Sequence, residues 1–373
     1  MSWENFQWKN IKETYMPIKW EPAIYEHKAA LIGKSPAEVA NSAEFLTEAV
    51  LKEYEIYQAD YITVGLDVYN IEAEALGAKL TLPGENECPD LAGKLYDLNN
   101  LPERLTLPDI PDAGRFRLLI EAGKNVNEAI GKKTKVRVAA SGPVTMAAKL
   151  AGIEDRIMSL CMLDGNAVRL LEFTTRIAEE WCLCLRRNGL DVIIFDSMVA
   201  PPMFSPDMFA EFALPLHRRL IGILEKYGQL ERELVIGGNT APIAALLPQT
   251  GANILLCDYA TDAAEFKSAL GDDSTLKVRR NINPALLREF NAELKSKSTA
   301  AECRGYHKST SAAAALCCRA PSSKNAIRND MKDLAKKFSS ELLLFKNPIA
   351  GTGILPFDFN PHKFLDFRRS VIC

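Results

Sequence analysis

The chain has 373 residues, 47% of them hydrophobic and 25% charged, which is the balance of a folded protein with a large core. A net charge of −3 and a pI near 6.0 argue against a nucleic-acid partner. No run of about 18 apolar residues and no apolar signal segment occurs, so we expect no membrane span and a cytoplasmic protein. Nine scattered cysteines in so large a chain favour reduced thiols over a disulfide framework.

Short β-branched runs alternate with helical patterns along the chain. Ser35, Pro36 and Glu38 have the spacing of a capped helix start, and this helical pattern continues to residue 59. A later helix is expected to stop at Gly189. Strands are predicted at 15–20, 60–66, 136–141, 191–197, 233–238, 253–259, 276–281 and 341–347.

The predicted strands are continuous apolar runs without strict alternation, as in parallel sheets that are buried on both faces. About eight such strands with helices between them predict one (β/α)8 TIM barrel domain over residues 1–373. A doubly wound open sheet is the alternative. Residues 1–16 are expected to be an N-terminal extension.

The segment 295–330 breaks the alternation with small residues, lysines and clustered thiols, which predicts an irregular excursion or lid. Cys303, His307, Cys317 and Cys318 lie within it and could hold a metal. Their spacing matches no paired CxxC zinc pattern.

Polar side chains follow most of the predicted strands, at the end where a parallel barrel places its active site. Asp67 and Asp196 are the candidate catalytic acids, because crowding of carboxylates raises a pKa; each could instead cap a helix. Arg280 could bind an anionic substrate or pair with Asp258. The candidate substrate-binding residues are Tyr69, Asn70, Ser141, Ser197, Asn239, Asp258, Arg280, Asn281 and Thr352.

Other chemistry-bearing residues have structural interpretations. Cys182 and Cys184 are two apart on a predicted helix, so they face different sides and are expected to pack in the core. His217 lies within a helical pattern and is also expected to be structural. No dinucleotide fingerprint, P-loop or GxSxG motif occurs, so nucleotide-dependent and triad chemistry lack support.

Several longer stretches together resemble one known family. They are "YEIYQADYITVGLDVYNIEAEALGAKL", "AASGPVTMAAKLAG", "GLDVIIFDSMVAPPMFSPDMFAEFALPLHRRL" and "GGNTAPIAALLPQTGANILLCDY". Their order and spacing resemble the uroporphyrinogen decarboxylase superfamily, especially its cobamide-dependent methyltransferase branch, from about Pro17 onward except for 295–330. The resemblance implies a (β/α)8 barrel. It places Asp67 at an aspartate of the second strand and Ser197 at a serine that contacts substrate.

The sequence departs from both activities of that family. The decarboxylases bind substrate carboxylates through an N-terminal arginine-rich stretch, whereas no arginine precedes Arg104 here. The methyltransferases hold zinc through an HxCGN turn and a later GC turn. Val235, Gly237 and, near the C-terminus, Thr352 occupy the corresponding ligand positions, although another alignment places Cys317 or Cys318 at the last of them. We therefore expect no zinc site.

The resemblance implies a methyltransferase component that moves a methyl group from a small O- or N-methylated substrate to a corrinoid protein. The corrinoid would be carried by that partner protein, and the chain itself could form a homodimer. One alternative is a decarboxylase-like lyase in which Asp67 stabilises a protonated intermediate of a carboxylated substrate. Another is a non-catalytic barrel that only binds its ligand.

Overall fold

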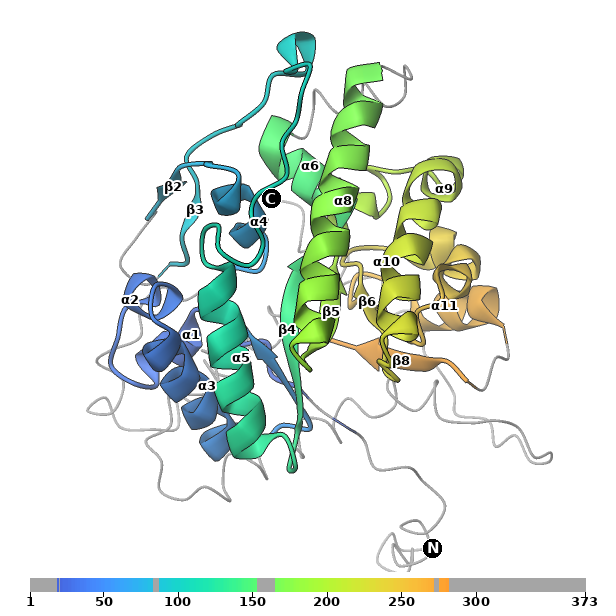
Figure 1. Ribbon diagram of the computed structural model, residues 1–373. Helices are drawn as coiled ribbons and strands as arrows, with labels where there is room; N and C mark the ends of the chain where they lie inside the picture. The colour runs from blue at the N-terminus through green and yellow to red at the C-terminus, as the bar shows by residue number, and fades with distance from the viewer. Residues whose placement is uncertain (1–18, 20, 83–86, 153–164, 272–274, 282–373) are drawn as a thin grey trace, which may run out of the picture.

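A single parallel sheet organises the protein (Figure 1). The computed structural model describes residues 19, 21–82, 87–152, 165–271 and 275–281. Six strands lie side by side in the order β1-β4-β5-β6-β7-β8. Their bounds are Tyr61–Val64 for β1, Lys135–Ser141 for β4, Asp191–Phe195 for β5, Glu233–Val235 for β6, Ile254–Cys257 for β7 and Lys277–Arg280 for β8.

The order of these strands separates the two predicted architectures. Every neighbour in the sheet is also the next of these strands along the chain, and all five pairings are parallel. A doubly wound sheet reverses its strand order at a switch point, and the six described strands contain no such reversal. The order is that of a (β/α)8 barrel.

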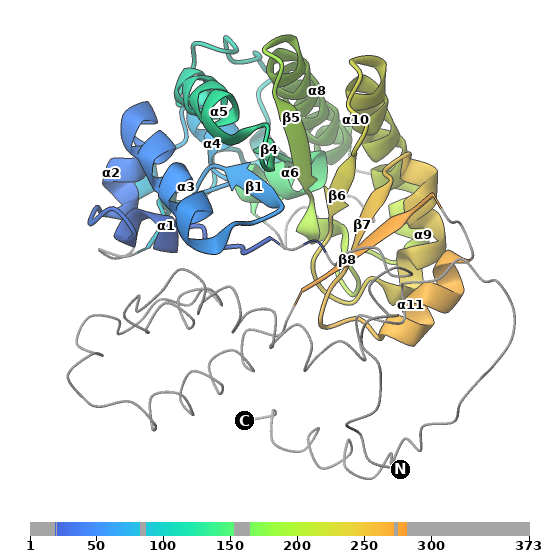
Figure 2. The same cartoon turned by 90° about the horizontal axis from the view of Figure 1, so that it is seen from below.

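The sheet curls, and the long helices cover its convex side (Figure 2). Seen from below, the strands follow one another along an arc, with α3, α5, α8, α10 and α11 outside it. The barrel prediction is therefore confirmed in part, as a curled half-barrel within the described residues. Of the two remaining predicted strands, 341–347 and all of 15–20 except Lys19 lie outside those residues, as do 1–16 and 295–330.

The helices begin and end where local chemistry dictates. Ser35 Oγ accepts a hydrogen bond from Glu38 N, and the Glu38 side chain accepts one from Ser35 N, which confirms the predicted capping box. The helix predicted to run to residue 59 divides into two, because Ser42 caps a second helix through Phe45 N at 3.1 Å. Gly189 has φ +74° just beyond α8, as expected at a helix end.

The remaining elements complete the connections between strands. The α-helices are α1 His27–Ala30, α2 Pro36–Ala40, α3 Ala43–Tyr57, α4 Ile71–Ala75, α5 Phe116–Ile130, α6 Pro143–Ala151, α8 Gly165–Arg187, α9 Pro206–Met208, α10 Leu214–Lys226 and α11 Ala263–Leu270. The other short elements are the antiparallel pair β2 Leu80–Thr81 and β3 Asp90–Leu91, the 3-10 helices η3 Leu98–Asn100, η4 Ser197–Val199 and η6 Ala241–Thr250, and a π-helical turn η5 Phe209–Ala213. Within the described ranges, no helix has the length and apolar character needed to cross a membrane.

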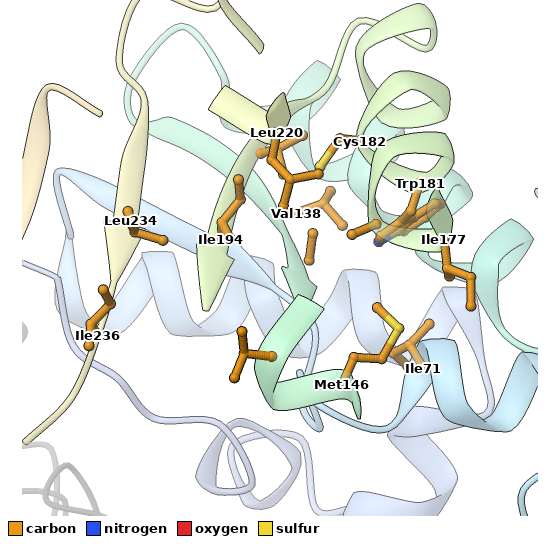
Figure 3. Close-up of a cluster of buried hydrophobic side chains, with 14 of the residues drawn as sticks. Ile71, Val138, Met146, Ile177, Trp181, Cys182, Ile194, Leu220, Leu234 and Ile236 are labelled. Carbon is orange, nitrogen blue, oxygen red and sulfur yellow. The ribbon is translucent and has the colours of Figure 1, made fainter. Parts of the chain in front are cut away.

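The main core fills the space between the sheet and its outer helices (Figure 3). Val138 of β4, Ile194 of β5 and Leu234 of β6 face Trp181 and Cys182 of α8. The alternate residues of these strands, together with Leu256 of β7, form a second, smaller cluster on the concave face, which contains Ala139, Ile193, Phe195 and Val235. Side-chain parity therefore decides which residues can reach the interior of the barrel.

Below the small cluster, toward the amino ends of the strands, buried charges bridge the concave face. Arg137 of β4 donates to Glu21 at 2.5 Å and also pairs with Glu233 of β6. Arg279 of β8 lies 3.0 Å from Glu21 and 2.8 Å from Glu233. Burial opposes ionisation of Glu21, yet Arg137 and Arg279 lower its pKa to about 2. These four residues, the inner ion network, join strands that are not all neighbours.

Candidate active site

Five residues that follow β1, β5, β6, β7 and β8 meet on the concave face. Tyr69 Oη lies 3.4 Å from Ser197 Oγ, which accepts a hydrogen bond from Gly237 N at 3.2 Å. A Cβ added to Gly237 would lie 3.7 Å from Asp258 Oδ2, and that oxygen accepts from Asn281 Nδ2 at 3.0 Å. We call these residues (Tyr69, Ser197, Gly237, Asp258 and Asn281) the rim cluster. Four of them were predicted as substrate-binding residues, and the structure brings them together.

Asp67 lies on the other side of this site. It pairs with a cation that was not among the predicted site residues. Arg115, at the start of α5, donates from Nη1 to Asp67 Oδ1 at 3.0 Å and from Nη2 to Oδ2 at 2.7 Å. Arg115 Nε also donates to Glu74 Oε2 at 2.5 Å. Burial raises the pKa of Asp67, while the two contacts with Arg115 act in the opposite direction. Asp67 is thus a buried carboxylate in a bidentate pair.

A cavity of about 410 Å³ adjoins Asp67 and reaches Tyr69 of the rim cluster. It lies between three segments that are far apart in the sequence, 25–26, 66–70 and 87–90, with Lys149 of α6 beside them. Asp67, Tyr69 and Asn70 line it, so three predicted site residues share one cavity. Its volume is within the range of small-molecule sites, roughly 300–1,000 Å³.

Asn70 enters the cavity wall in a fixed orientation. Its Nδ2 donates to the Pro89 carbonyl oxygen at 2.5 Å, which identifies the amide nitrogen. Its Oδ1 is buried and accepts no hydrogen bond from any residue that the structure describes, and the side chain is only 5% exposed. A buried acceptor without a donor is unfavourable, so a donor reaching this oxygen would be stabilising.

Cys88 also lines the cavity, and no motif in the sequence pointed to this residue. Cys88 Sγ donates to the Leu66 carbonyl oxygen at 3.6 Å. Burial, with a smaller contribution from Glu26, raises the pKa of this thiol to about 12. At neutral pH the group is therefore a thiol and not a nucleophilic thiolate.

Ser141 lies near the site, but its hydrogen-bonding groups already bind other residues of the protein. Its backbone N and its Oγ donate to the two carboxylate oxygens of Glu72, each at 2.8 Å, and Oγ lies 2.9 Å from the Val68 carbonyl. Burial raises the pKa of Glu72. Ser141 thereby ties the end of β4 to the loop that carries Asp67 and Tyr69. In the sequence, the only sign of this contact was a glutamate among the small residues of "IEAEA".

Asp196 is directed away from the cavity, toward the helices. Ile193 and Phe195 face the concave side, so residue 196 faces the opposite one. Its Oδ1 accepts from the N and Oγ1 of Thr145, at 2.7 and 2.6 Å, and its Oδ2 lies 2.8 Å from His217 Nε2. Asp196 is fully buried and caps α6, the helix of the preceding βα unit. The expected structural role of His217 fits this contact.

The remaining predicted site residues are not gathered with Asp67. Asn239 Oδ1 accepts from Ala241 N at 3.2 Å, within the turn that leads into η6. The alternative pairing of Arg280 with Asp258 is not formed: Asp258 accepts from Asn281, and no ion pair of Arg280 occurs among the described residues. Arg279, the preceding residue of β8, points to the opposite face of the sheet and is the one that faces the interior of the barrel. Thr352 lies outside the described residues.

The zinc positions implied by the family resemblance do not fit a metal where the structure describes them. Val235 packs against Ile193, Phe195 and Leu256, and Gly237 has no side chain. Nowhere in the described part of the chain do three His, Cys, Asp or Glu side chains gather in a way that could hold a metal ion. Cys303, His307, Cys317 and Cys318 lie outside that part.

Comparison with known proteins agrees with the strand order and the resemblance in sequence. The family model for uroporphyrinogen decarboxylase (URO-D) matches residues 22–319, which is most of the chain. The protein therefore belongs to the URO-D family.

Individual relatives are distant. The chain is 22% identical to the methylcobamide:CoM methyltransferase MtaA of Methanosarcina barkeri over 246 residues, 66% of this chain and 71% of the relative. It is 30% identical to the uroporphyrinogen decarboxylase of a Picosynechococcus strain, over only 30% of this chain and 31% of that protein. A methyltransferase structure from Methanosarcina mazei aligns with TM-score 0.64 at 16% identity, covering 86% of this chain and 95% of that chain. At this identity the structural likeness shows the fold alone.

Proposed function

We propose that this protein is a methyltransferase component that transfers a methyl group from a small O- or N-methylated compound to a corrinoid protein. Membership of the URO-D family and similarity to MtaA over most of both chains support this class of reaction. The corrinoid would arrive on a partner protein and would supply the nucleophile that accepts the methyl group.

The charge of the cavity wall is the observation that carries the proposal. Its two nearby cations are both engaged, Arg115 by Asp67 and Glu74 and Lys149 by Asp90 at 2.8 Å. A substrate with several carboxylates would find no free positive charge among the described lining residues and would face further acids. A small uncharged or cationic methyl compound fits this cavity better than a polycarboxylate does.

The residues would act mainly by positioning. Asp67, fixed by Arg115, and Tyr69, next to Ser197, would orient the substrate so that its methyl carbon faces the docked partner; such positioning can contribute several kcal/mol, about 7–11 at best. Asp67 would be the acid that protonates an alkoxide leaving group, worth roughly 10²–10⁴-fold, and it would first have to take up a proton, because its contacts with Arg115 favour the carboxylate. Asp196 would act as a positioning residue through α6 and not as an acid.

This direction of transfer requires no activated thiol substrate, so the proposal uses no zinc. Val235 and Gly237 stand where relatives of the methyltransferase branch are expected to hold their ligands. Transfer that survives dialysis against a strong chelator would agree with this part of the proposal. Loss of transfer on dialysis, restored by Zn²⁺, would contradict it.

The decisive experiment incubates the purified full chain with a reduced corrinoid protein and a panel of methoxy and methylamine compounds. Methylation is read from the corrinoid absorption spectrum. We expect methylation with at least one compound and a marked loss of rate in Asp67→Asn. Absence of methylation across the panel, or carbon dioxide release from a carboxylated compound without any corrinoid protein, would overturn the proposal in favour of a binding protein or a lyase.

A further inference from the structure

The acids that line the cavity outnumber its cations. Glu26, Asp67, Glu87 and Asp90 contribute four carboxylates. Arg115 pairs with Asp67 and Lys149 with Asp90, whereas Glu26 and Glu87 form no ion pair with any described residue. Glu26 is half-buried, so its charge acts on the cavity with less screening than that of an exposed side chain. The cavity therefore favours a cation.

Two tyrosines add surfaces suited to a methylated cation. Tyr25 and Tyr69 line the same cavity, and both are partly buried against the small hydrophobic cluster on the concave face. Burial raises the pKa of both phenols, so they remain neutral at physiological pH. Neutral aromatic rings attract alkylammonium groups through their π-faces and provide apolar contact for methyl carbons.

The unsatisfied oxygen of Asn70 lies just under the cavity wall, so a ligand reaches it only after a small shift of the neighbouring side chains, and it then restricts the ligand further. Because Asn70 Nδ2 is bonded to Pro89, only Oδ1 remains, and it can only accept. A methoxy oxygen is itself an acceptor, and a quaternary ammonium has no N–H, so neither can satisfy Asn70. A protonated secondary or tertiary amine has both the positive charge and the N–H donor.

Resting on the proposed function, we infer that the methyl donor is an N-methylated ammonium that keeps at least one N–H, bound among Tyr25, Glu26, Asp67, Tyr69 and Asn70. The transfer is balanced without an added proton. The C–N bond breaks, its electron pair stays on nitrogen, and a neutral amine leaves, while the acceptor supplies the pair for the new bond to carbon. An ether would instead release an alkoxide that needs an acid.

Three probes of similar size test this assignment in the absence of any corrinoid protein. 2-(Methylamino)ethanol has the charge and the N–H, choline has the charge alone, and 2-methoxyethanol has neither; all three share one hydroxyl group, so that donor does not distinguish them. Titration calorimetry of the full chain should show the methylamino compound binding at least about tenfold more tightly than either of the others. Equal affinities, or tighter binding of choline or the ether, would overturn the inference.

Two variants locate the binding. Glu26→Gln should weaken binding of the methylamino compound about fivefold or more and leave 2-methoxyethanol unaffected. Glu48→Gln makes the same charge change on an exposed part of α3, outside the cavity, and should change nothing. Asn70→Leu should reduce the preference for the methylamino compound over choline. The inference fails if Glu26→Gln behaves like Glu48→Gln.

Failure of this inference and failure of the proposed function give different results. Methylation of a corrinoid protein from methoxy compounds but not from methylamines would sink the inference and leave the methyltransferase intact. Selective binding of the methylamino compound without methylation of any corrinoid protein would support the ligand class and remove the proposed reaction.

Discussion

Arg115 and Asp67 face each other through two parallel hydrogen bonds, of 3.0 and 2.7 Å, although 48 residues separate them in the chain. Both side chains are at most 7% exposed. The pair joins the start of α5 to the loop after β1, and so it holds one wall of the cavity. It takes up one acceptor site on each oxygen of Asp67 and leaves the other site of each oxygen free.

Replacing Arg115 by Met should destabilise the protein strongly, because Asp67 would remain buried without its counter-ion. Removal of one partner of a buried pair costs about 3–5 kcal/mol in free energy of unfolding. Urea denaturation measures this change. Arg117→Met is the matched control, since Arg117 pairs with Asp112 at the exposed surface and should contribute less than about 1 kcal/mol. Similar losses in both variants would contradict the importance assigned to the buried pair.

Gly142→Ala should be poorly tolerated. A Cβ at this position would lie 2.2 Å from both the Cβ and the Cγ of Asp196, so the backbone at the start of α6 must shift. We expect a loss of roughly 3 kcal/mol or more, at the upper end for single substitutions. Gly222→Ala in α10 meets open space and should instead stabilise by about 0.5–1 kcal/mol. Thermal unfolding of the two variants should therefore shift in opposite directions.

Asp196→Ala should unfold more easily, because it leaves Thr145 N and His217 Nε2 buried without a partner. At about 1–3 kcal/mol for each unsatisfied group, the combined loss should reach several kcal/mol. Asp207→Ala, at an exposed position of α9, should change stability by at most about 1 kcal/mol. If Asp196→Ala is as stable as the control, Asp196 does not hold α6, and a direct role in the reaction would regain support.

Glu53 should make stability depend on pH in the acidic-to-neutral range. Burial raises its pKa from 4.5 to about 7, although Lys28 lies 3.2 Å away and opposes the shift. The folded state therefore holds the proton more tightly, and the resulting stability is complete below pH 4.5 and is lost as the pH rises toward 7. The shift corresponds to roughly 3 kcal/mol. Glu53→Gln should abolish this decline in the free energy of unfolding, whereas the exposed Glu48→Gln should retain it.

Much of the architecture could be predicted because apolar runs mark buried strands. All six strands of the parallel sheet fall within or next to a predicted range, whereas the short strands β2 and β3 were not predicted; the capping box at Ser35 was visible as a local motif. The predicted helix to residue 59 was wrong in its continuity, since Ser42 offered a second cap inside a favourable helical pattern. A capping side chain acts over only a few residues, but there it can interrupt a helix that the hydrophobic periodicity predicts as continuous.

The site was harder to predict because it depends on side-chain parity and on distant partners. β5 reads "DVIIF" and is apolar on both faces, so its pattern does not say whether Asp196 or Ser197 faces inward. Asp67, Tyr69 and Asn70 were found because they directly follow a strand. Arg115, Glu26 and Cys88 were not, because they reach the cavity from other segments and carry no motif.

The inner ion network has a consequence for how the chain selects its final strand pairing. Glu233 and Arg137 lie on the concave face, and their sequence neighbours Leu234, Val136 and Val138 lie on the apolar helix side. A one-residue shift in the register of β4 or β6 would place a charged side chain among those hydrophobic side chains. It would also break the pairing of Arg137 with Glu21 or of Glu233 with Arg279. In strands that are hydrophobic on both faces, a one-residue shift of register would otherwise cost little free energy. The four charged residues therefore specify the register that the hydrophobic residues alone leave ambiguous.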